Sequence, residues 1–277
     1  MLKQYLPFFK AGAIKTINYR FNTFTWLVIS VLQIVCIIFL WIGVYSSSPL
    51  GGDSVINGFT FKEMIVYVVF INIFNFVSFS SETTWEINEE IRNGTIANSY
   101  IKPISYRLRF TFQILGNAFI QALIFGLPSF IIAYTIFLLL GFITIESIGI
   151  MLLNIFLFLV AQVLAILLMD SVNYICGILC FYTTASWGLN NLKNVIVSFL
   201  SGSLIPLAFF PGIFSDILSY SPFSGISQNP VLILMLKMDL ISALKAIGLS
   251  LVWVIALELI AKLLFMKASK KITVQGG

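Results

Sequence analysis

Four carboxylates lie close together in the longest polar stretch of the chain, residues 81–103 (SETTWEINEEIRNGTIANSYIKP). They are Glu82, Glu86, Glu89 and Glu90. At 100° per residue their side chains fall within an arc of roughly 100° on an α-helix, while Ile87 and Ile91 point the opposite way. The pattern predicts a short amphipathic helix with one acidic face, which stops at Asn93-Gly94.

Two interpretations of this acidic face are open. It is either a solvated charged surface or a docking surface for a basic partner. Four carboxylates on one arc repel one another, whereas an opposing basic surface would be steered towards them. Their spacing is not that of metal ligands and the chain contains no His, so we expect neither a metal site nor a catalytic residue.

A further carboxylate, Asp170, lies inside an apolar run together with Asn173 (LLMDSVNY). Charged groups within a membrane are costly and usually face a bundle interior or water. A role in a transport pathway and a structural role near an interface both remain open. Cys176 and Cys180 share the same run, but without any His we expect small buried hydrophobes there.

Composition sets the environment in which these groups must be positioned. The chain of 277 residues is 59% hydrophobic and 10% charged, with a mean hydropathy of +1.01. Soluble domains are less apolar and about 25% charged, so we expect one integral membrane domain over residues 1–277. Lys and Arg exceed acidic residues by 16 to 11. They gather in loops and at the ends, which indicates membrane topology and not nucleic-acid binding.

The apolar runs predict an all-α, polytopic membrane protein with about six transmembrane helices. The expected spans are residues 24–45, 64–80, 111–141 (kinked near Gly126–Pro128), 148–187, a fifth from Val195, and 241–265. The run 148–187 is interpreted as one long helix, with two crossings as the alternative. Residues 188–194 (GLNNLKN) are expected to form a loop. Basic residues collect on one side if both termini are cytoplasmic, and residues 1–23 fit an amphipathic helix on the inner membrane surface.

One apolar segment, residues 201–230 (SGSLIPLAFFPGIFSDILSYSPFSGISQNP), is broken by Pro206, Pro211 and Pro222. Irregular backbone survives at membrane depth only where it is packed in protein or lines a wet cavity. The segment is therefore either a re-entrant element between the fifth and sixth spans or a long outer loop with interfacial aromatic residues.

Several motifs together resemble the ABC-2-type permeases, the membrane subunits of ABC exporters. They are YR (19–20), IRNGTIANSYIKPISYR (91–107), GILCFYTTASWGL (177–189), SGSLIPLAFFP (201–211) and VQGG (274–277). The resemblance covers nearly the whole chain, and the bacterial branch that it suggests often pairs two different permeases with one ATPase. Tyr100 departs from the Leu expected there, which puts the packing of that loop in doubt.

The resemblance implies roles for specific residues. Residues 81–110 would contain a cytoplasmic coupling helix that inserts into the ATPase, formed around Glu82, Glu86, Glu89, Glu90, Arg92, Asn93 and Gly94. The extracellular re-entrant region 201–230 would close the outer end of the pathway, with a gate at Ser201, Gly202, Pro206, Phe209, Phe210 and Pro211. The protein would lie in a bacterial plasma membrane with two ABC ATPase subunits and a second, related permease. ATP and Mg would bind to the ATPase, and this chain would hold no cofactor.

The sequence contains no GxxxxGK[ST] motif, so the chain is expected to depend on a separate subunit for ATP. Two other classes of function compete with a permease. An intramembrane lipid-modifying enzyme normally needs a His base, paired acids or a metal cluster. An ion-coupled secondary transporter is favoured by midplane charges and internal repeats, and Asp170 stands almost alone. The apolar, aromatic composition favours an amphipathic or lipophilic substrate.

Overall fold

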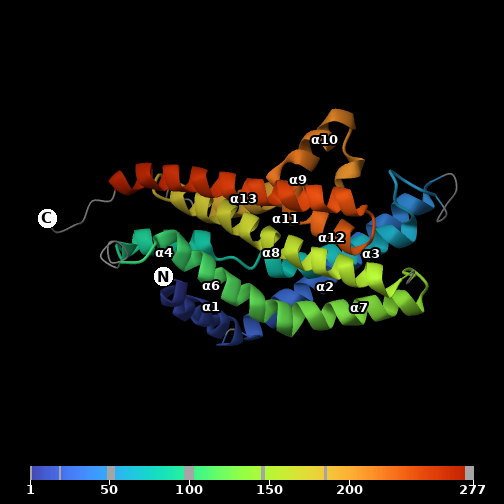
Figure 1. Cartoon of the computed structure of the whole chain (residues 1–277), viewed down its shortest axis with the longest axis horizontal. Helices are drawn as coiled ribbons and strands as arrows, with labels where there is room; N and C mark the ends of the chain where they lie inside the picture. Colours follow the sequence, from blue (N-terminus) through green and yellow to red (C-terminus); the bar gives the residue numbers. More distant parts are fainter. Residues whose placement is uncertain are drawn as a thin grey trace.

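The computed structural model describes residues 2–18, 20–48, 54–96, 103–144, 147–183 and 186–271. Within these ranges the regular elements are helices, and β-type pairing is limited to an isolated bridge between Ile56 and Phe59. The predicted all-α class is confirmed. Figure 1 shows the long helices running along one axis of an elongated bundle. Tyr19, Tyr100 and the terminal VQGG lie outside the described residues.

The elements follow one another along the chain with short connections. The first half contains η1 (Leu2–Tyr5), α1 (Leu6–Asn18), α2 (Arg20–Ser46), α3 (Phe61–Ser78), α4 (Thr83–Arg92), α6 (Tyr106–Gln121), the π-helical turn η3 (Ala122–Gly126) and α7 (Leu127–Leu139). The second half contains α8 (Ile148–Leu179), α9 (Ser186–Leu200), η4 (Leu207–Phe209), α10 (Gly212–Tyr220), α11 (Pro222–Ile226), α12 (Gln228–Leu234), α13 (Leu240–Ala268) and η5 (Ser269–Lys271).

Five helical segments are long and apolar enough to cross a membrane. They are Thr23–Ser46, Phe61–Arg92, Tyr106–Leu139, Ile148–Leu179 and Leu240–Ala268. These segments confirm a polytopic membrane protein. The end of the bundle that carries α1, α4 and the last turns of α13 (Figure 1) is called the inner end below, because its basic residues predict that it faces the cytoplasm.

Two details of the predicted spans are confirmed. The run that begins at Ile148 forms one helix of 32 residues, α8, and not two crossings, but α8 ends at Leu179 and not at 187, because Ser186 and Trp187 belong to α9. The third span changes its winding between Ala122 and Gly126, immediately before Pro128, where five residues form a π-helical turn. Proline has no N–H for the helical ladder, and a π-turn is one of the ways in which a helix accommodates the missing bond.

The predicted fifth span is wrong in its start. Residues 188–194 are helical and belong to α9, which has 15 residues and is too short to cross the bilayer alone. The buried Lys193 side chain holds this stretch against α8 through Asn173 and also bonds Asn190, so its polar groups are not solvated as in a loop.

The fifth crossing is completed by a second helix that is distant in sequence. The backbone N–H of Gln228, the first residue of α12, donates to the carbonyl of Ser201 at 3.2 Å, directly after α9 ends. α9 has 15 residues and α12 has 7, and 22 helical residues placed end to end would extend about 33 Å at 1.5 Å each. Residues 202–227, called the excursion below, leave the crossing and return to it.

Among the five clusters of buried side chains in the described residues, two are called the outer and the inner cluster below. The outer cluster is aromatic and includes Trp41, Tyr45, Tyr67 and Phe70. The inner cluster joins α4, α6, α8 and α13 through Ile87, Tyr106, Phe110, Tyr174, Ile178 and Ala261. The inner cluster is therefore the part of the core that positions the predicted acidic helix.

Candidate functional site

The predicted amphipathic helix exists as α4, and it is fixed to the inner end of the bundle by its apolar side. Ile87 is fully buried and fills a hollow at Gly177 of α8, where an added Cβ would lie 2.6 Å from the Ile87 Cδ1 atom. The Thr84 hydroxyl donates to the backbone carbonyl of Asn173 at 2.9 Å. The helix ends at Arg92, and Gly94 has a φ of +69°, which confirms the predicted stop at Asn93-Gly94.

Three of the four carboxylates bond to basic or polar side chains of the same chain. Glu82 and Glu86 both contact the ammonium of Lys15 on α1, with 2.7 Å between Lys15 Nζ and Glu86 Oε1. Glu90 pairs with Arg109 at 2.6 Å and accepts a hydrogen bond from Tyr106. Neither of the two open interpretations included these partners within the chain, because Lys15 and Arg109 lie far from the carboxylates in the sequence.

The ion pairs with Glu82 and Glu86 raise the pKa of Lys15. Burial by itself lowers the pKa of the Lys15 ammonium, but the hydrogen bonds that it donates to Glu82 and Glu86 outweigh burial and raise that pKa above its ordinary value. A raised pKa keeps the ammonium charged at physiological pH. The stabilisation that this pairing contributes is complete below the ordinary lysine pKa and is lost only as the pH rises through the raised value.

α1 itself is pressed against α6 with unusually little space between the backbones. A Cβ added at Gly12 would lie 2.0 Å from the carbonyl oxygen of Gln113, and one added at Gly116 would lie 1.9 Å from that of Phe9. Glycines at both positions let the two helices approach this closely. The predicted helix over residues 1–23 is present as η1 and α1, but α1 ends at Asn18 and residues 20–23 already belong to α2. Through Lys15, α1 supports α4 from the side.

The outward side of α4 is accessible at the inner end of the molecule. The exposed residues there are Trp85, Glu89 and Arg92 of the helix, followed by Asn93 and Gly94, and we call these five the α4 tip. Trp85, Glu89 and Arg92 recur at helical spacing on one face. Sequence reasoning missed Trp85, although an exposed aromatic side chain four residues before Glu89 is the kind of anchor that protein interfaces favour.

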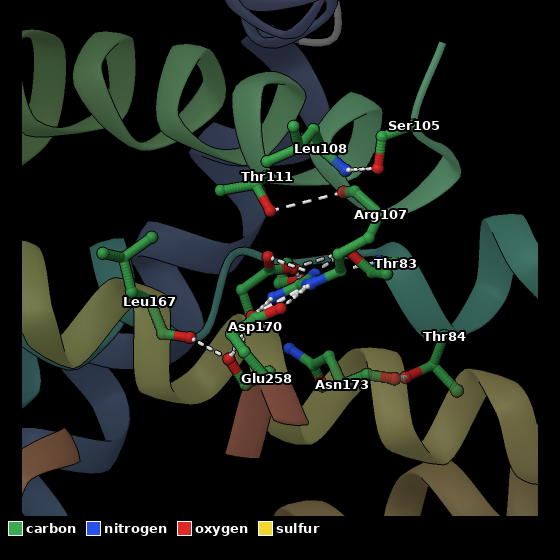
Figure 2. A network of polar contacts seen from close by, with 12 residues as sticks. Thr83, Thr84, Ser105, Arg107, Leu108, Thr111, Leu167, Asp170, Asn173 and Glu258 are labelled. Carbon is green, nitrogen blue, oxygen red and sulfur yellow. Dashed lines mark hydrogen bonds and ion pairs between the residues drawn. The ribbon is translucent and has the colours of Figure 1, made fainter. Parts of the chain in front are cut away.

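Asp170 lies at the centre of a polar network that joins four helices (Figure 2). Its side chain is fully buried and one oxygen is 2.7 Å from Arg107 Nη1 of α6. The other oxygen accepts from the Thr83 hydroxyl at the start of α4 at 2.9 Å. Arg107 also donates to Glu258 of α13, with 3.0 Å from Nε to each carboxylate oxygen.

This set, called the Arg107 network, is completed by Ser171 of α8, whose hydroxyl donates to Glu258 at 2.8 Å. The Arg107 guanidinium also lies over the Tyr174 ring, 4.7 Å from its centroid. Planar guanidinium groups suit such multiple carboxylate contacts. The i,i+4 spacing suggests a pair between Glu258 and Lys262, but Glu258 bonds to Arg107 and Ser171 instead.

Asn173 lies one turn beyond Asp170 and is also fully buried. Its side-chain oxygen accepts from the Lys193 ammonium of α9, and its backbone carbonyl accepts from Thr84. Asp170 and Asn173 therefore both hold α4 against α8. Their placement supports the structural interpretation and connects them to the predicted acidic helix.

The residues of the predicted gate do not form one surface. Ser201, Gly202 and Pro206 are buried where the excursion leaves α9. Phe209 packs on Trp41 of α2, with ring centroids 5.1 Å apart. Phe210 packs between Phe199 and Phe214, and Pro211 is the N-cap of the exposed helix α10.

The excursion starts and ends within the bundle, as Ser201 and Gln228 show, and Figure 1 shows α10 projecting sideways from it. The re-entrant interpretation of this segment stays a prediction. Within the described ranges, no group of three His, Cys, Asp or Glu side chains could hold a metal ion.

A comparison with protein families places these features in a known class. A family model described as ABC-2 family transporter protein matches residues 31–276, which is most of the chain. A comparison with curated proteins found no match. The chain therefore belongs to the ABC-2 transporter family and is a membrane-spanning permease of an ABC transporter, a class of protein that associates with ATPase subunits.

Proposed function

We propose that this permease couples ATP hydrolysis on two separate ABC ATPase subunits to the export of a substrate across a bacterial plasma membrane. ATP and Mg bind to those subunits, and this chain has no ATPase activity of its own. The observation that carries the proposal is the position of α4. Its tip is exposed at the inner end, while its other side is bonded to helices that cross the membrane.

Force applied to the α4 tip reaches three membrane helices through short contacts. Thr83 and Thr84 hold α4 to α8, and the Arg107 network continues to α6 and α13. Because buried ion pairs and packed side chains shift between discrete arrangements and deform little, such a junction moves as a unit. An ATP-driven conformational change of the ATPase would therefore rearrange the membrane-crossing helices and would not merely bend α4.

A second permease, related to this chain, completes the pathway in our proposal. Only 6% of the most apolar window of α2 is buried by the rest of the described chain. Ile213, Ile217 and Tyr220 of α10 are also more than half exposed. Lipid and a second permease both suit such apolar faces. The aromatic residues along α9 and α10 favour an amphipathic or lipophilic substrate, which would bind between the two permeases.

Two charge-reversal variants on α4 distinguish an effect on ATPase binding from an effect on the stability of the permease. We expect Glu89→Lys to weaken binding of the ABC ATPase about tenfold, roughly 1.4 kcal/mol, without changing thermal stability, because Glu89 is exposed. Glu90→Lys is the matched control. It breaks the bond to Arg109 and places two cations together, so we expect the unfolding temperature to fall.

The measurement is the affinity of the purified permease, held in nanodiscs, for its ABC ATPase, together with unfolding monitored by tryptophan fluorescence. Binding of the Glu89→Lys variant with wild-type affinity would contradict a docking role for the α4 tip. A loss of stability equal to that of Glu90→Lys would contradict the exposed position of Glu89.

A further inference from the structure

The excursion is attached to α3 at both of its ends by a single side chain. Asn75 Nδ2 donates to the Ser203 hydroxyl at 2.8 Å, near the start of the excursion. The Ser227 hydroxyl donates to Asn75 Oδ1 at 2.7 Å, at its last residue. One amide thus uses its donor and its acceptor to hold two segments that are 24 residues apart in the chain.

A second residue of α3 fixes the point where the helix breaks. The Tyr67 hydroxyl donates to the carbonyl of Gly202 at 2.6 Å, and Gln228 Oε1 accepts from the backbone N–H of Leu207, also at 2.6 Å. Gly202 has a φ of +80°, and an added Cβ would lie 2.6 Å from Gln228 Oε1. The broken backbone is therefore hydrogen-bonded to α3 and to α12, as membrane depth requires.

The same helix leads directly to α4. α3 ends at Ser78, and α4 begins at Thr83 after four connecting residues. The inner end of α3 is also held to α8, since Gln162 donates to the Ser78 hydroxyl at 2.8 Å. Asn75 lies within one turn of that end. A displacement of α4 is therefore applied to the helix that carries both attachments of the excursion.

We propose that Asn75 and Tyr67 are positioning residues that transmit movement of α4, through α3, to the excursion. This inference rests on the proposed coupling to an ABC ATPase. Asn75 moves both ends of the excursion together, and Tyr67 moves the break between α9 and α12. The excursion then shifts as one body, and α10 shifts with it.

A competing route runs through α13, because Trp253 Nε1 donates to the carbonyl of Tyr220 at the end of α10, at 2.8 Å. The test compares the two routes. Spin labels at Ile213→Cys on α10 and Leu159→Cys on α8, in a Cys36→Ser background, report the position of the excursion against the core. Ile213 and Leu159 are exposed, whereas Cys176 and Cys180 are buried.

The distance between the labels is measured with and without ATP and vanadate in the complex of permease and ABC ATPase. We expect Asn75→Leu to reduce the ATP-dependent distance change at least fivefold while the rate of ATP hydrolysis stays within twofold of wild type. Tyr67→Phe removes one hydroxyl and keeps the buried ring, so we expect a smaller reduction, about twofold. It keeps the proposal testable if Asn75→Leu does not fold.

Asn72→Leu is the matched control, since among the described residues the Asn72 amide bonds only to Val68 of its own helix. We expect it to behave as wild type. An undiminished distance change in Asn75→Leu and Tyr67→Phe, or its loss in Trp253→Phe alone, would overturn the inference and leave the proposed function intact. The labelled permease without substitutions at Asn75, Tyr67 or Trp253 tests the proposed function itself. If it neither binds the ATPase nor shows any ATP-dependent distance change, the proposed function is overturned, and the inference with it.

Discussion

Arg107→Met is expected to lower the stability of the permease by about 3–5 kcal/mol, because it leaves Asp170 as a buried charge without a counter-ion. The Asp170 side chain is fully buried and that of Arg107 is 13% exposed, so water cannot replace the guanidinium. For a chain of this size such a loss corresponds to a fall of roughly 10 °C in Tm. Tryptophan fluorescence of the purified protein during heating measures it.

Two further variants separate the charge from the side-chain volume. Arg107→Met/Asp170→Asn removes both charges and is expected to recover much of the lost stability. Lys15→Met breaks ion pairs whose side chains are 24–52% exposed, and we expect a loss of at most about 1 kcal/mol. A wild-type Tm for Arg107→Met would show that Asp170 does not depend on this partner.

Gly116→Ala is expected to release α1 from α6 and to uncouple the ATPase. The new Cβ would lie 1.9 Å from a backbone oxygen of Phe9, which cannot yield as a flexible side chain would. Overpacking costs about 1–3 kcal/mol, so the population with α1 detached rises by about fivefold to 150-fold. Lys15 then leaves Glu82 and Glu86, and α4 loses its lateral support.

The measurement is the rate of tryptic cleavage at Lys10 and Lys15 in the native permease, which follows the population of the open form. Gly43→Ala is the matched control, because a Cβ at Gly43 in α2 meets nothing within 4 Å and alanine favours a helix. Equal cleavage rates in the two variants would contradict the close approach of α1 and α6.

Local sequence patterns predicted the helices of this site, because interactions between residues close in the sequence determine where a helix forms and ends. Helical periodicity and Asn93-Gly94 located α4, and the length of the apolar run made α8 one helix. The partners of the charged residues could not be predicted in this way. Glu86 bonds to Lys15 across 71 positions, and Arg107 bonds to Glu258 across 151. No local rule selects between such partners.

The fifth crossing shows the same limit in the backbone. A hydropathy pattern ends α9 where polar and proline residues appear, and it cannot show that Gln228 returns to Ser201. The polar stretch 188–194 resembled a loop because Lys193 and its neighbours are hydrophilic. Their hydrogen bonds to Asn173 and within α9 make that stretch helical.

Site-specific photo-cross-linking in intact cells tests the central idea most directly: that the α4 tip receives the stroke of an ABC ATPase. A photoreactive residue is placed at Glu89 in the tip and, in a second variant, at Leu139, which is 83% exposed at the other end of the bundle. We predict that position 89 cross-links to a protein that mass spectrometry identifies as an ABC ATPase, and that position 139 does not. Failure of position 89 to capture an ABC ATPase, or equal capture from position 139, would contradict the account.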